Sequence, residues 1–424
     1  MNRKRLSLVA AAALALSSVT IAFGGASHAR AQGTTLELWH GWNGAYADAI
    51  TQVFDDYNKT NTDGITVNLT NVTGLNDALQ VAIPAGQGPD IIAWADDVIG
   101  NNALAGNIAP ISDYGITEDW LKENYEPAAV NGVIYDGKIW GLPEAQEGVS
   151  LICNSALVKP EDFPSDPQDF AGLLTLATKF HTDNPDKFLI YNQGLDTANS
   201  GGDAYHASPI WYGFGAFYVD ETGKVGINTP EGLAAGQWLI DAAKVFPTQA
   251  SQDQGLAALT GGTGACMWTG PWELADVKKS GISYFIQPFG RPFVGIKVEL
   301  MTTNAVDRGN AEAVVKVLQF FDSADVQAKL SIANSTIPAA TAALANPDVA
   351  KNSDVAGFGA QFNLGVPQPN TPYMGALWGP VGQATIAIFT GAQSPADALA
   401  AAEQGANDGI AAMNLPTPVP TEAS

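Results

Sequence analysis

The sequence predicts an α/β protein with two domains, and three features lead to this prediction. The chain has 424 residues, more than a single hydrophobic core usually supports. Its first hundred residues alternate strand-like and helix-like apolar patterns, the order typical of a mainly parallel sheet flanked by helices. A turn rich in Gly and Pro, residues 86–89, leads into a short apolar run at 91–94, as expected of a buried parallel strand.

The first elements follow one another in a regular order. Residues 36–40 alternate and are expected to form the first strand, followed by an amphipathic helix through 50–57. A second alternating strand is expected at 65–69 and a second helix at 75–85, before the strand at 91–94. This β-α-β-α-β order predicts that the strands lie parallel beneath helices.

The later part of the chain is expected to contain both strands and helices, with two long loops. A hairpin leading into an extended segment is expected at 135–143, and a crossing segment followed by a strand at 144–154. Helices are expected at 170–182, 231–245 and 311–321, and a strand and an extended run at 263–268 and 292–296. Loops are expected at 192–209 and 368–379, and a disordered tail at 415–424. The loop at 192–209 is rich in Gly, Asn, Asp and Ser, a composition typical of recognition loops. Helices are expected from 380 to about 413.

The N-terminus has the pattern of a secretory signal peptide. Arg3, Lys4 and Arg5 precede the apolar stretch 6–23, and Ala29-Arg30-Ala31 offers a small-x-small cleavage site. No Cys follows the apolar stretch, so a lipoprotein anchor is not indicated, and no later stretch is long enough to span a bilayer. Residues 1–31 are therefore predicted to be removed, leaving an exported, soluble protein in the periplasm or outside the cell, associated with the cell surface.

Composition excludes several classes of partner. A formal net charge of −23 disfavours nucleic acid and anionic membranes and favours a neutral or cationic ligand. Four scattered His and no Cys-x-x-Cys or His-x-x-His spacing give no sign of a metal site, and no cofactor fingerprint is present. Cys153 and Cys266, each in an apolar run, form either a disulfide or two buried free thiols.

The run at 91–94 ends on Trp94, and Asp97 follows it closely. Open α/β sheets bind ligands beyond the carboxyl ends of their strands, which would place this indole and this carboxylate at a cleft. A sugar needs both, because its C–H face packs on a flat apolar ring and its hydroxyls donate to oxygen acceptors. A lone Trp is more often part of a core, however, so the position alone does not decide.

Five motifs follow one another along the chain: Gly-x-Gly-Pro-Asp-Ile-Ile-x-Trp-Ala-x-Asp at 86–97, Gly-x-Pro-x-x-x-Glu-x-x-Ser-Leu-Ile-x-Asn at 141–154, Gly-Pro-Trp at 270–272, Pro-Phe-Val-Gly at 292–295 and Pro-Asn-x-Pro-x-Met-x-x-x-Trp at 369–378. In this order they resemble the bacterial family 1 extracellular solute-binding proteins of ABC importers, and among them the maltose and maltodextrin binders. Together they cover nearly the whole mature chain.

The resemblance implies a two-lobed periplasmic-binding-protein fold whose lobes are joined by hinge segments. By similarity the first lobe holds 32–143 and 297–347, and the second holds 144–292 and 348–414, with Ala145, Val294 and Gly295 near the crossings. The family binds a sugar between the lobes, closes by a hinge motion and presents the closed form to a membrane permease. The resemblance therefore implies an oligosaccharide ligand, an ABC permease as partner and a monomeric protein without enzymatic activity.

Site residues carried over from the family are aromatic and acidic. The sugar-contacting positions correspond to Trp94, Asp97, Glu147, Asp203, Tyr205, Trp272 and Trp378, and Trp42, Asn43 and His206 fall at neighbouring positions of the same site. Three departures remove polar contacts of a maltose site: Val98 stands in place of an Arg, and Gly379 and Gly382 stand in place of a Tyr and an Arg. They leave the aromatic platform intact and the identity of the sugar open.

Two further hypotheses come from other classes. Asp97 and Glu147 could form the carboxylate pair of a glycoside hydrolase, which uses one acid with a raised pKa; the resemblance favours binding instead. The same fold could also hold a different carbohydrate such as a β-glucoside, a polyol or a non-sugar solute, as the missing Arg and Tyr beside Trp378 suggest. Lys297 and Glu299, near the hinge, are expected to be a solvated pair, and the remaining Trp residues to be core or surface.

Overall fold

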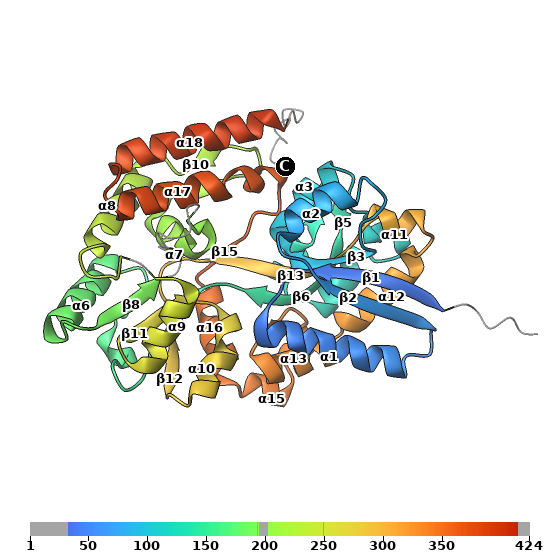
Figure 1. Cartoon of the computed structure of the whole chain (residues 1–424), viewed down its shortest axis with the longest axis horizontal. Helices are drawn as coiled ribbons and strands as arrows, with labels where there is room; N and C mark the ends of the chain where they lie inside the picture. The colour runs from blue at the N-terminus through green and yellow to red at the C-terminus, as the bar shows by residue number, and fades with distance from the viewer. Residues whose placement is uncertain (1–32, 193, 195–201, 249, 414–424) are drawn as a thin grey trace, which may run out of the picture.

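The computed structural model describes residues 33–192, 194, 202–248 and 250–413. Two lobes lie side by side along the long axis, each built on a sheet with helices packed around it (Figure 1). The predicted signal peptide 1–31, the tail 415–424 and part of the predicted loop 192–209 lie outside the described residues.

The first lobe is built on a seven-stranded sheet of order β14-β6-β13-β3-β1-β2, with β15 pairing the start of β13. Its strands are β1 Thr34–His40, β2 Ile65–Asn71, β3 Ile91–Ala95, β6 Gly141–Glu147, β13 Phe293–Met301, β14 Ile337–Pro338 and β15 Val366–Pro367. β1 pairs in parallel with both β2 and β3, as the βαβ pattern predicted. β13 then runs antiparallel to both β3 and β6.

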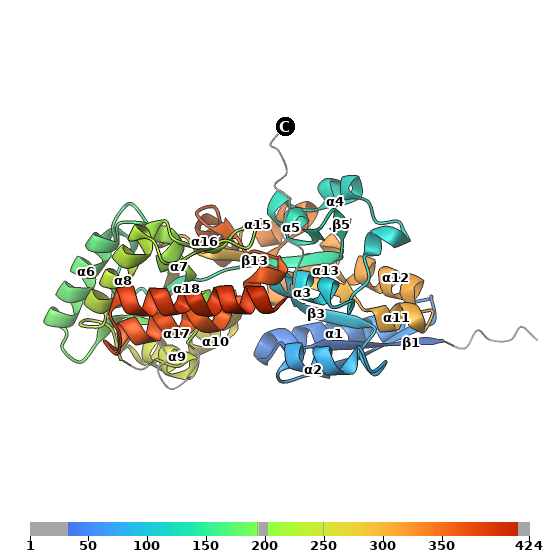
Figure 2. The same cartoon turned by 90° about the horizontal axis from the view of Figure 1, so that it is seen from above.

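Helices surround this sheet (Figure 2). They are α1 Gly44–Thr60, α2 Leu75–Ala82, α3 Ile99–Leu104, α4 Glu118–Asn124, α5 Pro127–Gly132, α11 Thr303–Asp307, α12 Ala311–Phe321, α13 Ala324–Asn334, α14 Thr341–Leu344 and α15 Pro347–Ala350, with 3-10 turns η1 Asp96–Val98 and η2 Ile111–Tyr114 and the hairpin β4 Ile134–Tyr135 and β5 Lys138–Ile139. α1 buries Tyr46, Ile50, Phe54 and Tyr57, and the last three of these lie on the apolar face predicted from the sequence.

The second lobe has a four-stranded sheet of order β12-β7-β11-β8. Its strands are β7 Ser150–Asn154, β8 Phe188–Asn192, β11 Gly264–Thr269 and β12 Tyr284–Gln287, with the hairpin β9 Phe217–Val219 and β10 Val225–Gly226. Its helices are α6 Phe170–Asp183, α7 Ala204–Phe214, α8 Pro230–Ala242, α9 Gln252–Gly261, α10 Leu274–Ser280, α16 Ser353–Phe362, α17 Trp378–Phe389 and α18 Pro395–Ala412, with 3-10 turns η3 Pro160–Asp162, η5 Pro271–Glu273 and η6 Pro372–Ala376.

Extended segments connect the lobes. β6 belongs to the first sheet and leads directly into β7 of the second. β13 spans both cores, because Phe293 at its start packs in the second core and Leu300 near its end packs in the first. A third link follows β15, where the side chain of Asn370 donates to the carbonyls of Gly132 and Ile134 in the first lobe, each at 3.0 Å.

Three sequence expectations need correction. The sheets are mixed rather than mainly parallel, because β13 and β7 each run antiparallel to two neighbours. Residues 204–209 of the predicted loop form the first half of α7. The segment 368–379 contains the 3-10 turn η6 and, at Trp378, the start of α17, rather than loop alone.

The two cysteines lie on neighbouring strands of the second sheet. Cys153 on β7 and Cys266 on β11 lie opposite each other in the antiparallel pair, and a disulfide joins them. Within the described part of the chain, no helix combines the length and apolar character needed to cross a membrane.

Candidate functional site

A cavity of about 570 Å³ lies between the lobes. Eight of the ten predicted site residues line it: Trp42, Trp94, Asp97, Glu147, Asp203, Tyr205, Trp272 and Trp378. Asn43 lines a neighbouring cavity that shares Trp94 with the first. His206 does not line the main cavity and is buried behind Asp203.

Trp94 and Trp42 form one aromatic wall of the cavity. Trp94 lies in β3, and Trp42 lies in the turn after β1, so the two parallel neighbours deliver both indoles to one edge of the sheet. The rings stack with centroids 4.5 Å apart and planes 22° apart. Gly41 makes room for this stack, since a Cβ at that position would lie 2.3 Å from the Trp94 ring.

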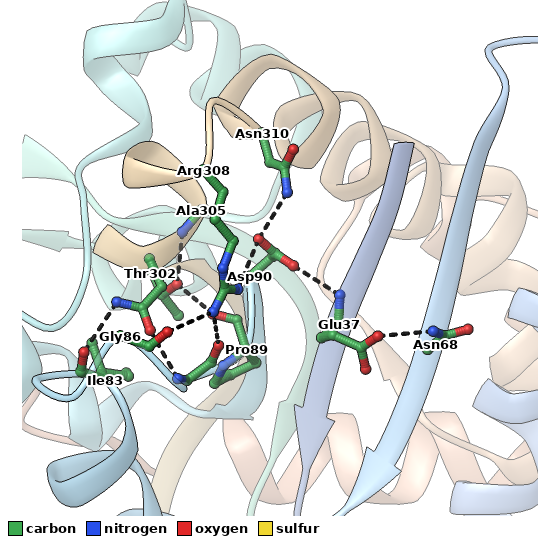
Figure 3. A network of polar contacts seen from close by, with 12 residues as sticks. Glu37, Asn68, Ile83, Gly86, Pro89, Asp90, Thr302, Ala305, Arg308 and Asn310 are labelled. Atoms are coloured by element: carbon green, nitrogen blue, oxygen red, sulfur yellow. Dashed lines mark hydrogen bonds and ion pairs between the residues drawn. The ribbon is translucent and has the colours of Figure 1, made fainter. Parts of the chain in front are cut away.

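The turn before β3 is held in place by a buried carboxylate (Figure 3). Asp90 Oδ2 accepts from the backbone N–H of Glu37 at 2.9 Å, and Oδ1 accepts from Arg308 at 3.2 Å and Asn310 at 3.1 Å. Arg308 also donates to the carbonyl of Gly88 at 2.7 Å. These contacts fix the start of β3 and therefore the position of the side chains at its end.

The opposite wall comes from the second lobe. Asp203 caps α7 by accepting from the backbone N–H of His206, which places Tyr205 in the first turn, facing the cavity. Trp272 follows β11 in η5, and Trp378 begins α17. The Tyr205 ring lies 6.4 Å from that of Trp272 and 6.5 Å from that of Trp378, centroid to centroid.

One hydrogen bond joins the two walls directly. The indole N–H of Trp378, from the second lobe, donates to Asp97 Oδ2, from the first, at 3.0 Å. Burial raises the pKa of Asp97 to about 6, although this hydrogen bond acts in the opposite direction. Asp97 is therefore mostly ionised at neutral pH and retains a second oxygen, Oδ1, that can accept from a ligand.

Asp203 and Tyr205 respond differently to burial. Burial opposes ionisation of Asp203, but the charge and hydrogen bonds of His206 outweigh it and lower the pKa of this carboxyl. His206 Nδ1 lies 2.6 Å from Asp203 Oδ2. The pKa of the Tyr205 phenol is raised well above its usual value, first by burial and then by the surrounding carboxylates, among them Glu147 and Asp97. Tyr205 therefore stays neutral and can both donate and accept.

The expectation of a solvated Lys297–Glu299 pair is wrong. Lys297 is 3% exposed and Glu299 is 1% exposed, because β13 is a central strand covered on both faces. The Lys297 ammonium lies 2.7 Å from Glu147 Oε1 and 3.3 Å from the centroid of the Tyr46 ring. It therefore holds Glu147 at the edge of the cavity.

Sequence reasoning also missed Gln368, which lines the floor of the cavity. Its backbone N–H donates to the carbonyl of Val294 at 3.0 Å, and its side-chain Oε1 is buried without a hydrogen-bond partner. Gly295 lies against it, since a Cβ there would be 2.5 Å from that oxygen. The available signal was its position between two prolines, just before the motif at 369–378. Prolines on both sides disfavour the interior of a sheet, so the polar side chain of Gln368 was a candidate for a loop that faces the site.

The arrangement suits a neutral or cationic polar molecule with apolar faces. Aromatic rings face the cavity from both lobes, and carboxylates placed between them accept hydrogen bonds. Among the described residues, no group of three or more His, Cys, Asp or Glu side chains is arranged to hold a metal ion.

Comparison with known proteins adds sequence and structural relatives. The family model described as bacterial extracellular solute-binding protein matches residues 52–357. A maltotriose-binding protein of Pyrococcus abyssi is 31% identical over 322 residues, 72% of this chain and 67% of that protein. A galactooligosaccharide-binding protein of Bacillus subtilis is 25% identical over 358 residues, 78% of this chain and 79% of that protein.

Solved structures share the fold. The maltose/maltodextrin-binding domain from Bdellovibrio bacteriovorus, bound to maltotriose, superposes with a TM-score of 0.77 at 20% identity, covering 89% of this chain and 100% of that one. This likeness confirms the two-lobed fold expected from the sequence motifs.

Proposed function

This chain belongs to the bacterial extracellular solute-binding proteins, and we propose that it binds an oligosaccharide between its lobes and delivers it to the permease of an ABC importer. The observation that carries the proposal is the cavity itself, where aromatic rings and carboxylates from both lobes converge. Flat rings cover the C–H faces of a pyranose, and carboxylates accept from its hydroxyls in short, strong hydrogen bonds.

Malto-oligosaccharides are the first ligands to consider. The relative from Pyrococcus abyssi is named for maltotriose and is 31% identical. The residues proposed to contact the sugar are those that line the cavity: Trp42, Trp94, Asp97, Glu147, Asp203, Tyr205, Trp272 and Trp378. Asn43 and His206 are proposed to act at its edge, Asn43 from the neighbouring cavity and His206 by orienting Asp203.

A second candidate is a different carbohydrate in the same cavity. Val98 and Gly382 stand where an Arg is expected by resemblance, and a relative named for galactooligosaccharides is 25% identical. A β-linked ligand is therefore tested beside the α-glucosides.

The remaining parts of the proposal follow from family membership. We propose lobes of 32–143 with 297–347 and 144–292 with 348–414, export by the signal peptide 1–31, and a monomeric protein that binds without turnover. The named relatives are binding proteins, which supports the last point. Incubating maltotriose with the protein and with Glu147→Gln, followed by chromatography, tests it; hydrolysis lost in the variant would favour a glycoside hydrolase.

Calorimetry with a panel of sugars tests the binding function. Maltose, maltotriose, maltotetraose, cellobiose, a galactooligosaccharide and maltitol are titrated into the mature protein, and we expect Kd near 1 μM, roughly −8 kcal/mol, for at least one. Trp272→Ala should weaken binding by about 2 kcal/mol or more if the ring is a central anchor.

Trp120→Ala on α4 is the matched control, because Trp120 does not line the cavity and its removal should leave affinity unchanged. Absence of heat with every sugar would contradict the proposal. Equal affinity of the Trp272 and Trp120 variants would remove Trp272 from the site.

A further inference from the structure

The charges around the cavity are unbalanced. Asp97, Glu147 and Asp203 line it from both lobes, and no Lys or Arg is among the described residues that line it. A neutral sugar needs donors as well as acceptors, because its ring and hydroxyl oxygens accept hydrogen bonds. Carboxylates supply acceptors only. Lys297 and His206 pair with Glu147 and Asp203 from outside the lining, so a neutral sugar would leave the charge of Asp97 uncompensated.

The aromatic rings add to the attraction for a cation. Five aromatic side chains, four Trp and one Tyr, line the cavity. The face of each ring carries a negative partial charge that attracts an ammonium group within about 6 Å of its centroid. Rings and carboxylates facing one space are the chemistry by which proteins recognise amines.

The protein already binds one ammonium in this way beside the cavity. The Nζ of Lys297 lies 2.7 Å from Glu147 Oε1, 3.3 Å from the Tyr46 centroid and 4.5 Å from the Trp42 centroid. Glu147 and Trp42 are also lining residues of the cavity. Lys297 itself is 3% exposed and attracted from behind by Glu144, so it balances Glu147 and reaches no further.

Asp97 has no such counter-ion, whereas Asp203 has His206 as its partner. Asp97 accepts from the indole N–H of Trp378, a neutral donor, so its negative charge remains. Asp203 is paired with the imidazole of His206, which lies behind it and away from the cavity. Asp97, Asp203 and Tyr205 all line the cavity, and after burial both carboxylates contribute to the raised pKa of the Tyr205 phenol. Glu147 and Asp96 also raise the pKa of Tyr205, although Asp96 is buried outside the lining.

We propose that the preferred ligand of this cavity is an oligosaccharide carrying a protonated amine, bound with the amine near Asp97, Asp203 and the Tyr205 ring. The proposal rests on the proposed function, since it specifies which class of sugar the same cavity takes. Neutral malto-oligosaccharides bind the same cavity through the aromatic rings, but more weakly. The formal net charge of −23 acts in the same direction by attracting cationic solutes to the protein.

The test compares maltose with isosteric amines. The probes are maltose and three derivatives in which the hydroxyl at C2′, C3′ or C6′ is replaced by an amine, together with the neutral N-acetyl form of each. Calorimetry at neutral pH and low salt should show at least one amine binding about tenfold or more tighter than maltose. The N-acetyl form should lose this advantage, and so should the amine itself at a pH above its own pKa or at high salt.

Asp97→Asn identifies the group responsible. The amide oxygen can still accept from Trp378, so the variant removes the charge and keeps the contact between the lobes. The amine-to-maltose affinity ratio should fall below about threefold in this variant. Asp119→Asn, an exposed acid on α4 that does not line the cavity, is the matched control and should leave the ratio unchanged.

Each outcome has one meaning. If maltose binds and no amine binds more tightly, the inference is overturned while the proposed function stands. If neither maltose nor any amine or neutral sugar binds, the proposed function fails and the inference fails with it. A preference for the amine that survives in Asp97→Asn overturns the placement of the amine beside Asp97.

Discussion

Replacing Lys297 by Met tests the role of the buried ion pair at the edge of the cavity. The substitution keeps most of the apolar stem and removes the charge, leaving Glu147 without its partner at 2.7 Å. The contact between the Lys297 ammonium and the Tyr46 ring is lost as well. Because Lys297 is 3% exposed and lies on the strand that joins the lobes, the effect is expected on stability first.

The magnitude follows from the separation and the exposure of the two groups. At 2.7 Å and an effective dielectric constant of about 20, the gross attraction is about 6 kcal/mol, part of which offsets the desolvation of both ions. Removing one partner of a buried pair costs about 3–5 kcal/mol. The Glu147 side chain is 14% exposed, so water can solvate part of the remaining charge, and we expect the lower value of about 3 kcal/mol.

Urea unfolding followed by circular dichroism measures this loss. The matched control is Lys316→Met, whose ammonium pairs with Asp63 at 3.3 Å in an exposed setting and should cost at most about 1 kcal/mol. Adding Glu147→Gln to Lys297→Met should recover part of the loss, since position 147 then carries no unpaired charge. If the Lys297 and Lys316 variants lose the same stability, Lys297 behaves as a solvated residue and the reasoning is refuted.

Three further predictions concern stability. Burial raises the pKa of Asp97 to about 6, so between about pH 4 and about pH 6 the native state binds a proton that the unfolded state has released. Stability should therefore fall as the pH rises through this range, and Asp97→Asn should flatten the plot of the urea midpoint against pH there. Asp90→Ala removes the acceptor of three hydrogen bonds and leaves Arg308 partly buried, and should cost about 3 kcal/mol in urea unfolding, while Asp90→Asn should cost less. The Cys153–Cys266 disulfide closes a sequence separation of 113, so urea unfolding under reducing conditions should show a loss of about 2–5 kcal/mol, and an unchanged midpoint would contradict a stabilising bond.

The first five elements of the fold could be predicted because the apolar pattern within each short stretch of sequence identifies its secondary structure. Alternating and helical apolar patterns identified β1, α1, β2, α2 and β3 in order, and the structure pairs these strands in parallel. The direction of β13 could not be predicted in the same way. An apolar run does not record which strand it will pair with, and β13 joins β3 from about two hundred residues further along the chain.

Two expectations were wrong because contacts within the folded chain outweighed the local sequence pattern. Lys297 and Glu299 looked solvated because charged residues rarely occupy a core, but a central strand buries both side chains. Glu147 compensates the charge of Lys297, while burial and then the neighbouring Asp322 and Glu144 raise the pKa of Glu299 well above its usual value. The sequence alone does not place these neighbours. Residues 204–209 looked like loop because they end a segment, 192–209, that is rich in Gly, Asn, Asp and Ser. In the structure α7 continues through Pro209, and the side chain of Asp203 supplies the N-terminal cap that begins it.

The residues at the floor of the cavity show why binding and hinge motion are coupled in this fold. Glu147 ends β6, Gly295 lies in β13 and Gln368 follows β15, so each connection between the lobes contributes to the lining. The backbone N–H of Ile296 donates to Asp96 Oδ1 at 3.1 Å, next to the cavity residue Asp97. A rotation of the lobes about these strands must therefore move the floor and the walls together. A ligand that contacts both lobes interacts differently with each interlobe angle, which is the condition for it to shift the population towards one of them.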